Sequence, residues 1–371
     1  MTRAQFDANL SVIHKAIAAG EFYQVNYTAP LQSDITGSPA ALFERLQRAQ
    51  PGGYAAYIDT GSEQILSVSP ELFFDWDGGQ AGGHILTRPM KGTAPRGTSP
   101  EQDALLAQNL THSPKERAEN VMIVDLLRND LSRIARPHSV KVPTLFAVQS
   151  LPTVHQMVSD VTAQTRPGTR LRDVFSTLFP CGSITGAPKV RAMQTICTLE
   201  PTPRRVYCGA IGLVHPGGHA TFNVAIRTVR IQGKQARCGI GSGITWDATP
   251  EREWQEWQHK RGFLERASEP FQLLETLRLQ AGQFQNLGAH LARLAGAARH
   301  FGYPFDEKSI RAALATLLPV DADDVPLLVP ATQPISQPLV VCRVRLLLNA
   351  DGTPHAEKFI QKARHPPYPL R

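Results

Sequence analysis

Two pairs of glutamates carry the clearest chemical signal in this sequence of 371 residues. Glu116 and Glu119 lie three positions apart in a stretch with helical spacing, and Glu253 and Glu256 repeat that spacing later in the chain. Residues three apart share one face of a helix, so each pair presents two carboxylates together. Carboxylate oxygens, some acting through water, suit Mg²⁺. The four glutamates predict a magnesium site, and solvated pairs on a helix surface are the plainer alternative.

A lysine and a glutamate are the candidate reactive groups. Lys91 stands between a proline and a glycine in residues 89–93, within a polar stretch over 88–100 that is typical of a loop. A lysine amine that stays partly neutral is a nucleophile. Glu71 ends a strand-like run, and a partly buried carboxyl there serves as a general acid. The alternatives are a solvated loop lysine and an exposed glutamate.

Several segments are suited to holding an anion. Residues 182–189 place small side chains before a helical stretch, which exposes backbone N–H groups. They do not match the nucleotide-binding loop pattern. Residues 241–243 form a second open backbone, and Arg227 follows an apolar strand where its fork can meet a carboxylate. Lys260 lies one turn after Glu256, where a surface ion pair is the alternative. Together these features predict a site for a compact anion with more than one carboxylate.

The periodicity predicts the elements that must position these groups. Apolar residues recur at helical spacing or in short strand-like runs separated by glycine turns. The predicted helices cover 6–17, 114–134, 171–178, 189–197 and 250–266, and the predicted strands cover 23–27, 55–59, 65–70, 206–214, 220–231 and 236–240. The sequence alone indicates only a mixture of α and β. At the end of the helix over 114–134, Asp125, Arg128 and Asp130 are expected to form ion pairs rather than to act in catalysis.

Composition excludes several classes of protein. Hydrophobic residues make up 42% and charged residues 19%, which is typical of a globular chain. Five cysteines without a CxxC pair disfavour zinc and redox chemistry. The net charge of +7 comes from scattered basic residues, so we expect no nucleic-acid partner. There is no apolar run of membrane length and no apolar signal core, so we expect no membrane association and a cytoplasmic location.

A change in the sequence pattern after residue 267 predicts two domains. Residues 268–270 mark the boundary, so the expected domains are 1–267 and 268–371. Residues 318–340 are rich in proline and carry few structural signals, which predicts a disordered connector there.

The pieces of the first domain, in this order, resemble the chorismate-utilising enzyme family. The resemblance covers residues 20–264 and rests on eight ordered motifs. They are residues 23–26, 69–71, 89–93, 119–130, 182–189, 207–210, 225–228 and 241–243. The family fold implies an α+β domain with antiparallel sheets packed face to face, helices outside and the site between the sheets. The family's first layer of strands normally begins well before residue 20, so we also expect an open sheet edge.

The resemblance also implies roles for individual residues. Lys91 would attack C2 of chorismate while Glu71 protonates the departing 4-hydroxyl. Glu119 and Glu256 would bind Mg²⁺, and Glu116 and Glu253 would act through water. The implied substrate-binding groups are the side chains of Arg227, Tyr207 and Lys260 and the backbones of Thr185, Gly241 and Ser242.

Two positions separate the branches of this family. Isochorismate and salicylate synthases carry a general-base lysine where this chain has Gln24, and anthranilate synthases have alanine at the position of Lys91. The combination implies the branch that forms 4-amino-4-deoxychorismate for 4-aminobenzoate and folate synthesis. No glutaminase segment is visible, so a partner glutamine amidotransferase would supply the ammonia. Gln156 stands where anthranilate synthases have histidine, and whether His155 beside it takes that role is open.

The second domain has a likeness of its own. Residues 274–278, 290–294 and 344–348 resemble the start of aminodeoxychorismate lyase, a pyridoxal-phosphate enzyme. The chain stops before the segment that should supply the Schiff-base lysine, so we expect a truncated lyase-like segment without pyridoxal phosphate. The alternatives to an aminating enzyme are an anthranilate synthase, an inactive remnant of a bifunctional synthase–lyase, and a binding module supported only by the positive charge.

Overall fold

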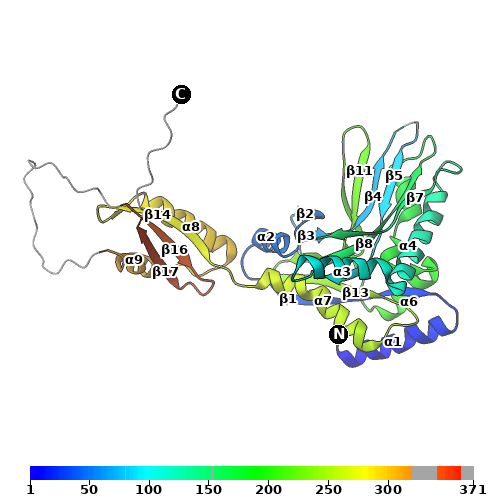
Figure 1. Cartoon of the computed structure of the whole chain (residues 1–371), viewed down its shortest axis with the longest axis horizontal. Helices are drawn as coiled ribbons and strands as arrows, with labels where there is room; N and C mark the ends of the chain where they lie inside the picture. The colour runs from blue at the N-terminus through cyan, green and yellow to red at the C-terminus, as the bar shows by residue number, and fades with distance from the viewer. Residues whose placement is uncertain (80, 152–153, 319–340, 361–371) are drawn as a thin grey trace, which may run out of the picture. The chain divides into compact units, whose positions relative to one another are not determined.

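The computed structural model describes residues 1–79, 81–151, 154–318 and 341–360 (Figure 1). Its contacts divide the chain into two compact units. The first holds Met1–Ile35 and Phe43–Ala267, and the second holds Thr36–Leu42 together with the chain from Ser268 onward. From residue 319 on, the predicted connector lies outside the described residues.

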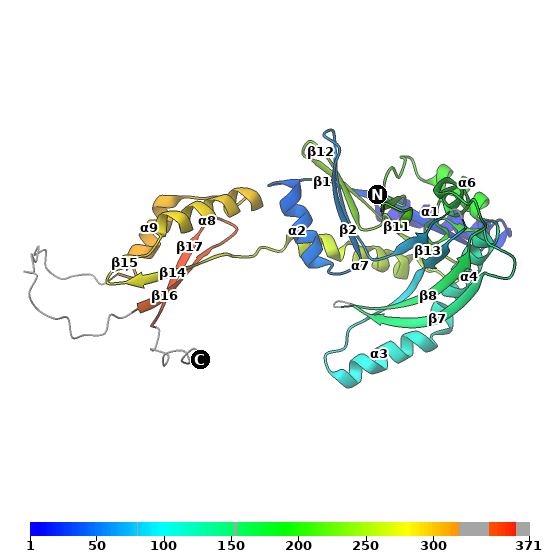
Figure 2. The ribbon, with the colours of Figure 1, turned by 90° about the horizontal axis from the view of Figure 1, so that it is seen from above.

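A seven-stranded antiparallel sheet forms one half of the first unit. Its strands run in the order β10-β11-β4-β5-β8-β6, with β7 also paired to β8. Their bounds are β4 (Leu72–Asp77), β5 (His84–Arg88), β6 (Met90–Pro95), β7 (Lys141–Ser150), β8 (Val154–Gln164), β10 (Ala210–Val214) and β11 (His219–Val224). Helix α4 (Pro114–Ser132) packs its apolar side against this sheet, and Ile123, Leu127 and Val161 are buried in the shared core. Figure 2 shows α3 (Pro100–His112) and α4 running beside β7 and β8.

A six-stranded antiparallel sheet forms the other half, in the order β2-β3-β12-β13-β1-β9. Its bounds are β1 (Gln24–Asp34), β2 (Tyr54–Asp59), β3 (Gln64–Ser69), β9 (Gly186–Ala187), β12 (Thr228–Gln232) and β13 (Gln235–Ile244). Helices α1 (Arg3–Ala18) and α7 (Pro250–Ser268) cover one face, where the rings of Phe6 and Trp257 meet at 4.9 Å. The alternation along β1 places Tyr27 in this core and turns Thr28 to the opposite face.

Short signals in the sequence set the helix starts. The Thr2 hydroxyl accepts the Gln5 amide and the Gln5 side chain accepts the Thr2 amide, which forms a capping box for α1. Ser113 caps α4 at the Glu116 amide, and Pro114 occupies the first turn, where no backbone N–H is needed. The remaining helices of this unit are α5 (Leu171–Leu178), η1 (Gly182–Ile184) and α6 (Lys189–Leu199), and α2 (Pro39–Ala49) follows β1.

From Ser268 onward, the described residues of the second unit form a four-stranded antiparallel sheet and two helices. The order is β15-β14-β16-β17, and the bounds are β14 (Leu273–Gln280), β15 (Gln283–Phe284), β16 (Val341–Leu348), β17 (Pro354–Ile360), α8 (Leu287–Phe301) and α9 (Glu307–Ala315). Leu277, Leu294 and Leu346 lie in a core separate from those of the first unit. Thr36–Leu42 belongs to this unit, and the Ser38 amide there donates to the His300 carbonyl at 3.4 Å. The likeness to a lyase stays a prediction.

The predicted α+β class with antiparallel sheets is confirmed. Clusters that include Ile65 of β3 and Ile211 of β10 join the two sheets of the first unit. Strand β10 ends the seven-stranded sheet and exposes Leu213 at 68% and Val214 at 55%. Within the described ranges, no helix combines the length and the apolar character needed to cross a bilayer.

Candidate functional site

Lys91 lies on a strand rather than in a loop, which differs from the sequence prediction. Strand β6 pairs with β8 from Met90 opposite Val158 to Thr93 opposite Gln156, with an irregular register between them. The pairing gives the polar stretch a fixed backbone that its composition does not reveal. The Lys91 ammonium donates to the Ser183 carbonyl at 3.5 Å, so a residue of η1 faces the tip of the lysine.

The opposite wall comes from the six-stranded sheet. A methyl group on Gly243 of β13 would lie 2.1 Å from Gln24 Nε2 and 3.4 Å from Lys91 Nζ. Gly243 therefore leaves the space in which the amide of β1 and the amine of β6 meet. The Gln24 side chain is 1% exposed, and both its amide atoms lack hydrogen-bond partners among the residues that the structure describes. A buried amide without partners is costly, so this side chain is suited to a polar ligand.

Glu71 sits at the start of β4 and is 4% exposed. Burial raises its pKa, while the charge of Lys91, the Ser183 hydroxyl and the Met90 amide act in the other direction. Within the described part of the chain, its Oε1 atom has no hydrogen-bond partner. A carboxyl with a raised pKa keeps its proton closer to neutral pH, which is what a general acid needs.

The four predicted metal ligands lie on two helices that face Lys91. Glu116 and Glu119 project from α4, and Glu253 and Glu256 project from α7. Burial raises the pKa of Glu119 to about 7, with Lys91 opposing and the negative charges of Glu116 and Glu256 adding to the rise. Burial also raises the pKa of Glu116, and Glu256 contributes to that shift. The carboxylates of the two helices thus repel one another across the site.

The two glutamates of α7 have different partners, a lysine for Glu256 and a hydroxyl for Glu253. Lys260 Nζ lies 2.6 Å from Glu256 Oε1 and donates to the Gly241 carbonyl at 2.9 Å. Burial alone would raise the pKa of Glu256, but the ion pair with Lys260 outweighs it and lowers that pKa. Glu253 is 3% exposed and accepts the Ser242 hydroxyl at 2.5 Å, and burial raises its pKa.

A cation would relieve the repulsion among these carboxylates. Among the described residues, no group of three or more histidine, cysteine, aspartate or glutamate side chains is gathered closely enough to hold a metal ion. The donor set still fits Mg²⁺, because it consists of carboxylates from two helices whose negative charges raise one another's pKa. The predicted metal role of these residues stays a prediction.

Arg227 and Thr185 are two further predicted substrate-binding residues. Arg227 has a left-handed backbone (φ 48°) and donates to the Gln50 side chain, and burial lowers its pKa to about 10. No carboxylate pairs with Arg227 in the described ranges. The Thr185 hydroxyl donates to the Cys181 carbonyl at 3.0 Å, and the Thr185 carbonyl accepts the Asn26 amide at 2.7 Å.

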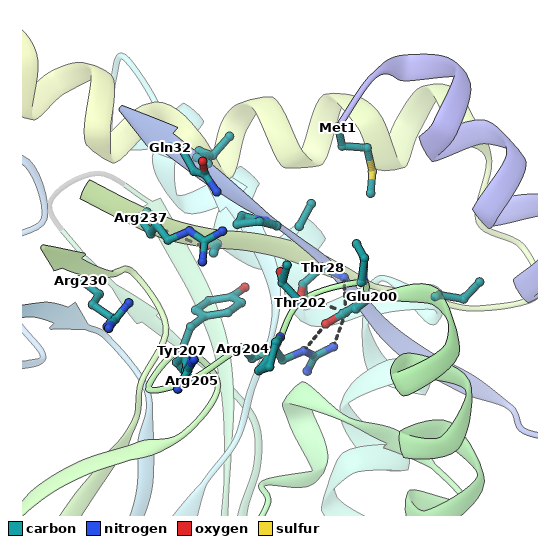
Figure 3. Close-up of a pocket in the computed structure, with 18 of the residues that line it drawn as sticks. Met1, Thr28, Gln32, Glu200, Thr202, Arg204, Arg205, Tyr207, Arg230 and Arg237 are labelled. Atoms are coloured by element: carbon teal, nitrogen blue, oxygen red, sulfur yellow. Dashed lines mark hydrogen bonds and ion pairs between the residues drawn. The ribbon is translucent and has the colours of Figure 1, made fainter. Parts of the chain in front are cut away.

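Tyr207 lines a separate cavity of about 800 Å³. Its ring covers Gly239, where a methyl group would lie 2.2 Å from the ring. Figure 3 shows Tyr207 between Arg237 and Arg204, with Thr28 and Glu200 on the far side of the cavity. Neither Lys91 nor Glu71 lines this space, although Thr28 is paired with Gly241 on the neighbouring strand. The cavity and the Lys91 site therefore adjoin along β1 and β13.

Gln156 and His155, whose roles the sequence left open, occupy successive positions on β8. Gln156 donates to the Gly92 carbonyl at 2.8 Å and accepts from Thr93 at 3.1 Å, which fixes the strand next to Lys91. His155 does not share this position. It is 1% exposed and its ring contacts Asp103 at 2.9 Å and Ser150 at 3.0 Å. Successive side chains of a strand point to opposite faces of the sheet. This alternation along β8 is the sequence signal that could have predicted different surroundings for the two residues.

The ion pairs expected at the end of α4 are present. Arg128 pairs with Asp125 at 2.8 Å, and Lys189 pairs with Asp130 at 2.6 Å. The second pair connects α4 to the start of α6. Both aspartates therefore take part in structural ion pairs.

Comparisons with known proteins identify the family of this chain. The family model described as chorismate binding enzyme matches residues 1–266. Aminodeoxychorismate synthase component 1 of Salmonella typhimurium (strain LT2) is 43% identical over 256 residues, which are 69% of this chain and 56% of that protein. Anthranilate synthase component 1 of Methanothermobacter thermautotrophicus is 36% identical over 259 residues, covering 70% and 55% of the two chains.

A solved structure gives the same picture of the fold. The crystal structure of anthranilate synthase component I from Streptococcus pneumoniae TIGR4 superposes with a TM-score of 0.65 at 30% identity. The match covers 71% of this chain and 58% of that one. The chain thus spans little more than half the length of the curated relatives that it matches.

Proposed function

We propose, because this chain belongs to the chorismate binding enzyme family, that it converts chorismate and ammonia to 4-amino-4-deoxychorismate. The product would serve 4-aminobenzoate and folate synthesis. The observation that carries the proposal is the position of Lys91 on β6, facing Gly243 and the unpartnered amide of Gln24, with Glu71 close by. The 43% identity to an aminodeoxychorismate synthase component supports it.

Lys91 acts as the nucleophile in this proposal. Its neutral amine forms a bond to C2 of chorismate, the two conjugated ring double bonds shift, and the C4–oxygen bond breaks. Ammonia then bonds to C4, both double bonds shift back, and the lysine amine leaves C2. The net change replaces the 4-hydroxyl by an amino group and releases water. Two displacements replace one difficult step, which is the advantage of covalent catalysis.

Glu71 donates the proton that the departing hydroxyl needs. Its pKa is raised, first of all by burial, which favours the protonated carboxyl. The nearby charge of Lys91 works against this rise, so attack by the amine and proton donation by Glu71 are coupled.

Mg²⁺ would be held by Glu119 and Glu256, with Glu116 and Glu253 acting through water. When bound, the ion would supply positive charge for the ring carboxylate of the substrate. The four glutamates lie on α4 and α7, and Lys260 balances the charge of Glu256.

The substrate carboxylates would be held by cations and backbone groups around this centre. Arg227 lacks a carboxylate partner among the described residues and has its charge disfavoured by burial, so an anion would stabilise it. We assign the same carboxylate-binding role to two further side chains, Tyr207 and Lys260. The backbones of Thr185, Gly241 and Ser242 would bind carboxylates as well.

Ammonia would come from a partner glutamine amidotransferase. The name "component 1" of the relatives supports a second subunit for those proteins. We extend this arrangement to the present chain as part of the proposal.

Anthranilate formation is the second candidate, because the Methanothermobacter relative at 36% identity is named anthranilate synthase component 1. Lys91 is the residue that favours amination at C4 instead. A chain that has lost activity is the third reading, and the same experiment decides among the three.

The test is a coupled assay with purified protein. Chorismate, Mg²⁺ and ammonium are mixed with the chain and an independent aminodeoxychorismate lyase, and 4-aminobenzoate is followed. Lys91→Ala is expected to lower the rate to below about one hundredth of wild type. Lys141→Ala, a change at an exposed lysine on β7, should leave the rate unchanged.

Each other outcome has a clear meaning. Anthranilate as the product would support the second candidate. Product without added lyase would contradict the expectation that the second unit has no lyase activity. A folded chain that consumes no chorismate would contradict the proposed function as a whole.

A further inference from the structure

A buried ion pair lines the cavity of Figure 3. Glu200 caps the C-terminus of α6, and Arg204 follows four residues later. Arg204 Nη2 lies 2.6 Å from Glu200 Oε1, and Nε lies 2.7 Å from Oε2, which is the two-bond fork that arginine makes with carboxylates. The side chains are only 14% and 7% exposed.

The remaining bonds of this pair reach two other segments. Arg204 donates to the Ile184 carbonyl and to the Asn26 carbonyl, each at 2.7 Å. Glu200 Oε1 accepts both the amide and the hydroxyl of Thr28 at 2.9 Å. The pair therefore connects the end of α6, the η1 turn and strand β1, and both Arg204 and Glu200 use several of their bonding groups outside the pair.

The bond to Ile184 has a geometric consequence for Thr185. A trans peptide is planar, with its N–H directed opposite to its carbonyl. When Arg204 holds the Ile184 carbonyl, the direction of the Thr185 N–H is fixed as well. Among the described residues, this N–H makes a long bond of 3.3 Å to the Gly182 carbonyl. It is therefore oriented without being strongly occupied.

We propose that Glu200 and Arg204 are positioning residues that orient the Ile184–Thr185 peptide toward a substrate carboxylate. The inference deepens the proposed function and rests on it, because Thr185 belongs to the proposed carboxylate subsite. Arg204 acts through this peptide and through the Asn26 carbonyl, and Glu200 acts by holding the guanidinium in its plane against Thr28.

The chemistry explains why arginine and glutamate stand at these positions. A lysine ammonium is a single point of charge and lacks the rigid fork that reaches two carbonyls and a carboxylate at once. Removal of Glu200 alone would leave a buried cation without its counter-ion, which disturbs the site more than removal of an exposed pair would.

The experiment compares Arg204→Lys with a matched change at an exposed ion pair on α6. Arg191 Nη2 pairs with Glu21 at 2.8 Å, but these side chains are 49% and 35% exposed, so Arg191→Lys is the control. Hydrogen exchange of a peptide covering residues 181–188 and the Kd for chorismate with Mg²⁺ are measured on the full chain. Glu200→Gln, which keeps the shape and the acceptors for Thr28, serves as the milder variant if Arg204→Lys folds poorly.

Arg204→Lys is expected to raise the exchange rate of this segment and the chorismate Kd by about tenfold each, the latter equal to ~1.4 kcal/mol. Free guanidinium should restore part of the affinity in Arg204→Ala. Arg191→Lys should change neither quantity. A folded Arg204→Lys with unchanged exchange and unchanged Kd would overturn the proposal.

The two levels of proposal fail in different ways. If wild type does not bind chorismate, the proposed function is wrong, and the exchange comparison by itself still decides whether Arg204 orients the peptide. If wild type binds chorismate and the variants lose only thermal stability, Glu200 and Arg204 serve the fold alone and the positioning role is rejected.

Discussion

At the scale of single residues, the site is governed by buried carboxylates around one lysine. Lys91 lowers the pKa of Glu71, Glu119 and Glu256, while burial acts in the opposite direction on all three. Only Glu256 has an ion pair strong enough to reverse the effect of burial. The local charge balance therefore leaves Glu119 sensitive to pH near neutrality.

This balance predicts how stability changes with pH. The pKa of Glu119 is about 7 in the folded chain and near 4.5 when unfolded. The folded state binds the proton more tightly, so stability falls as pH rises from about 4.5 to 7 and then levels off. Glu119→Gln should stabilise the metal-free chain at pH 8 by about 1–3 kcal/mol and have little effect at pH 4. Urea unfolding at the two pH values measures this.

Mg²⁺ provides the matched control for that prediction. Added Mg²⁺ should raise the unfolding midpoint of wild type at pH 8, where the carboxylates are charged, and much less at pH 4. Glu119→Gln should reduce the response. If Glu119→Gln destabilises the chain at pH 8, or if Mg²⁺ acts equally on both proteins, the role of Glu119 as a charged ligand is wrong.

At the scale of elements, strand β13 shapes the site because its glycines lack side chains. Gly243 leaves room for the Gln24 amide of β1 and for Lys91 of β6, so three strands from two sheets converge at one point. The Tyr207 ring occupies the space above Gly239, four residues earlier on the same strand. The alternate glycines of β13 thus allow side chains from elsewhere to lie against its backbone.

A methyl group at this point should disturb both packing and binding. We expect Gly243→Ala to lower the free energy of unfolding by about 1–3 kcal/mol, because the buried Gln24 must move. Chorismate affinity should fall as well. Gly296→Ala, where a methyl group meets no atom within 4 Å inside α8, should be neutral or slightly stabilising.

A double-mutant cycle identifies the clash as the cause. Gln24→Ala in the Gly243→Ala background removes the amide that the new methyl group would meet, so part of the lost stability should return. Strictly additive effects of the two changes would show that the collision with Gln24 is not responsible.

At the scale of the whole molecule, the chain has two units with separate cores. All four tryptophans lie in the first unit, at positions 76, 246, 254 and 257. Their fluorescence therefore reports that unit alone. The second unit has its own sheet, helices and buried leucines.

A core deletion in the second unit tests this division. Leu346 is fully buried there, and Leu346→Ala should cost about 2–5 kcal/mol of that unit's stability. Circular dichroism should show an earlier partial transition, while the tryptophan transition and chorismate turnover stay unchanged. Leu131→Ala, at a fully buried position of the first core, should shift the tryptophan transition instead. A single transition that moves equally in both variants would contradict two independent units.

Much of the fold and part of the site could be predicted from single residues and their spacing. The period of Phe6, Leu10 and Ile13 gave α1, and the spacing of Glu116 and Glu119 gave a shared helix face. Ion pairing of Asp125 with Arg128, three residues later, also followed from local sequence. These features depend on neighbours within one or two turns, which the sequence displays directly.

The sequence by itself determined the mixture of α and β and the residue types available for chemistry, because these depend on local periodicity. Its ordered motifs indicated the family and, through the family, the α+β fold. Only the tertiary structure decided that Lys91 lies on a strand, that Gln156 rather than His155 faces that strand, and that Arg204 reaches Ile184 and Asn26. Each of these depends on strand pairing or burial between segments far apart in the chain. Such pairings are set by packing of the whole core, which no local pattern encodes.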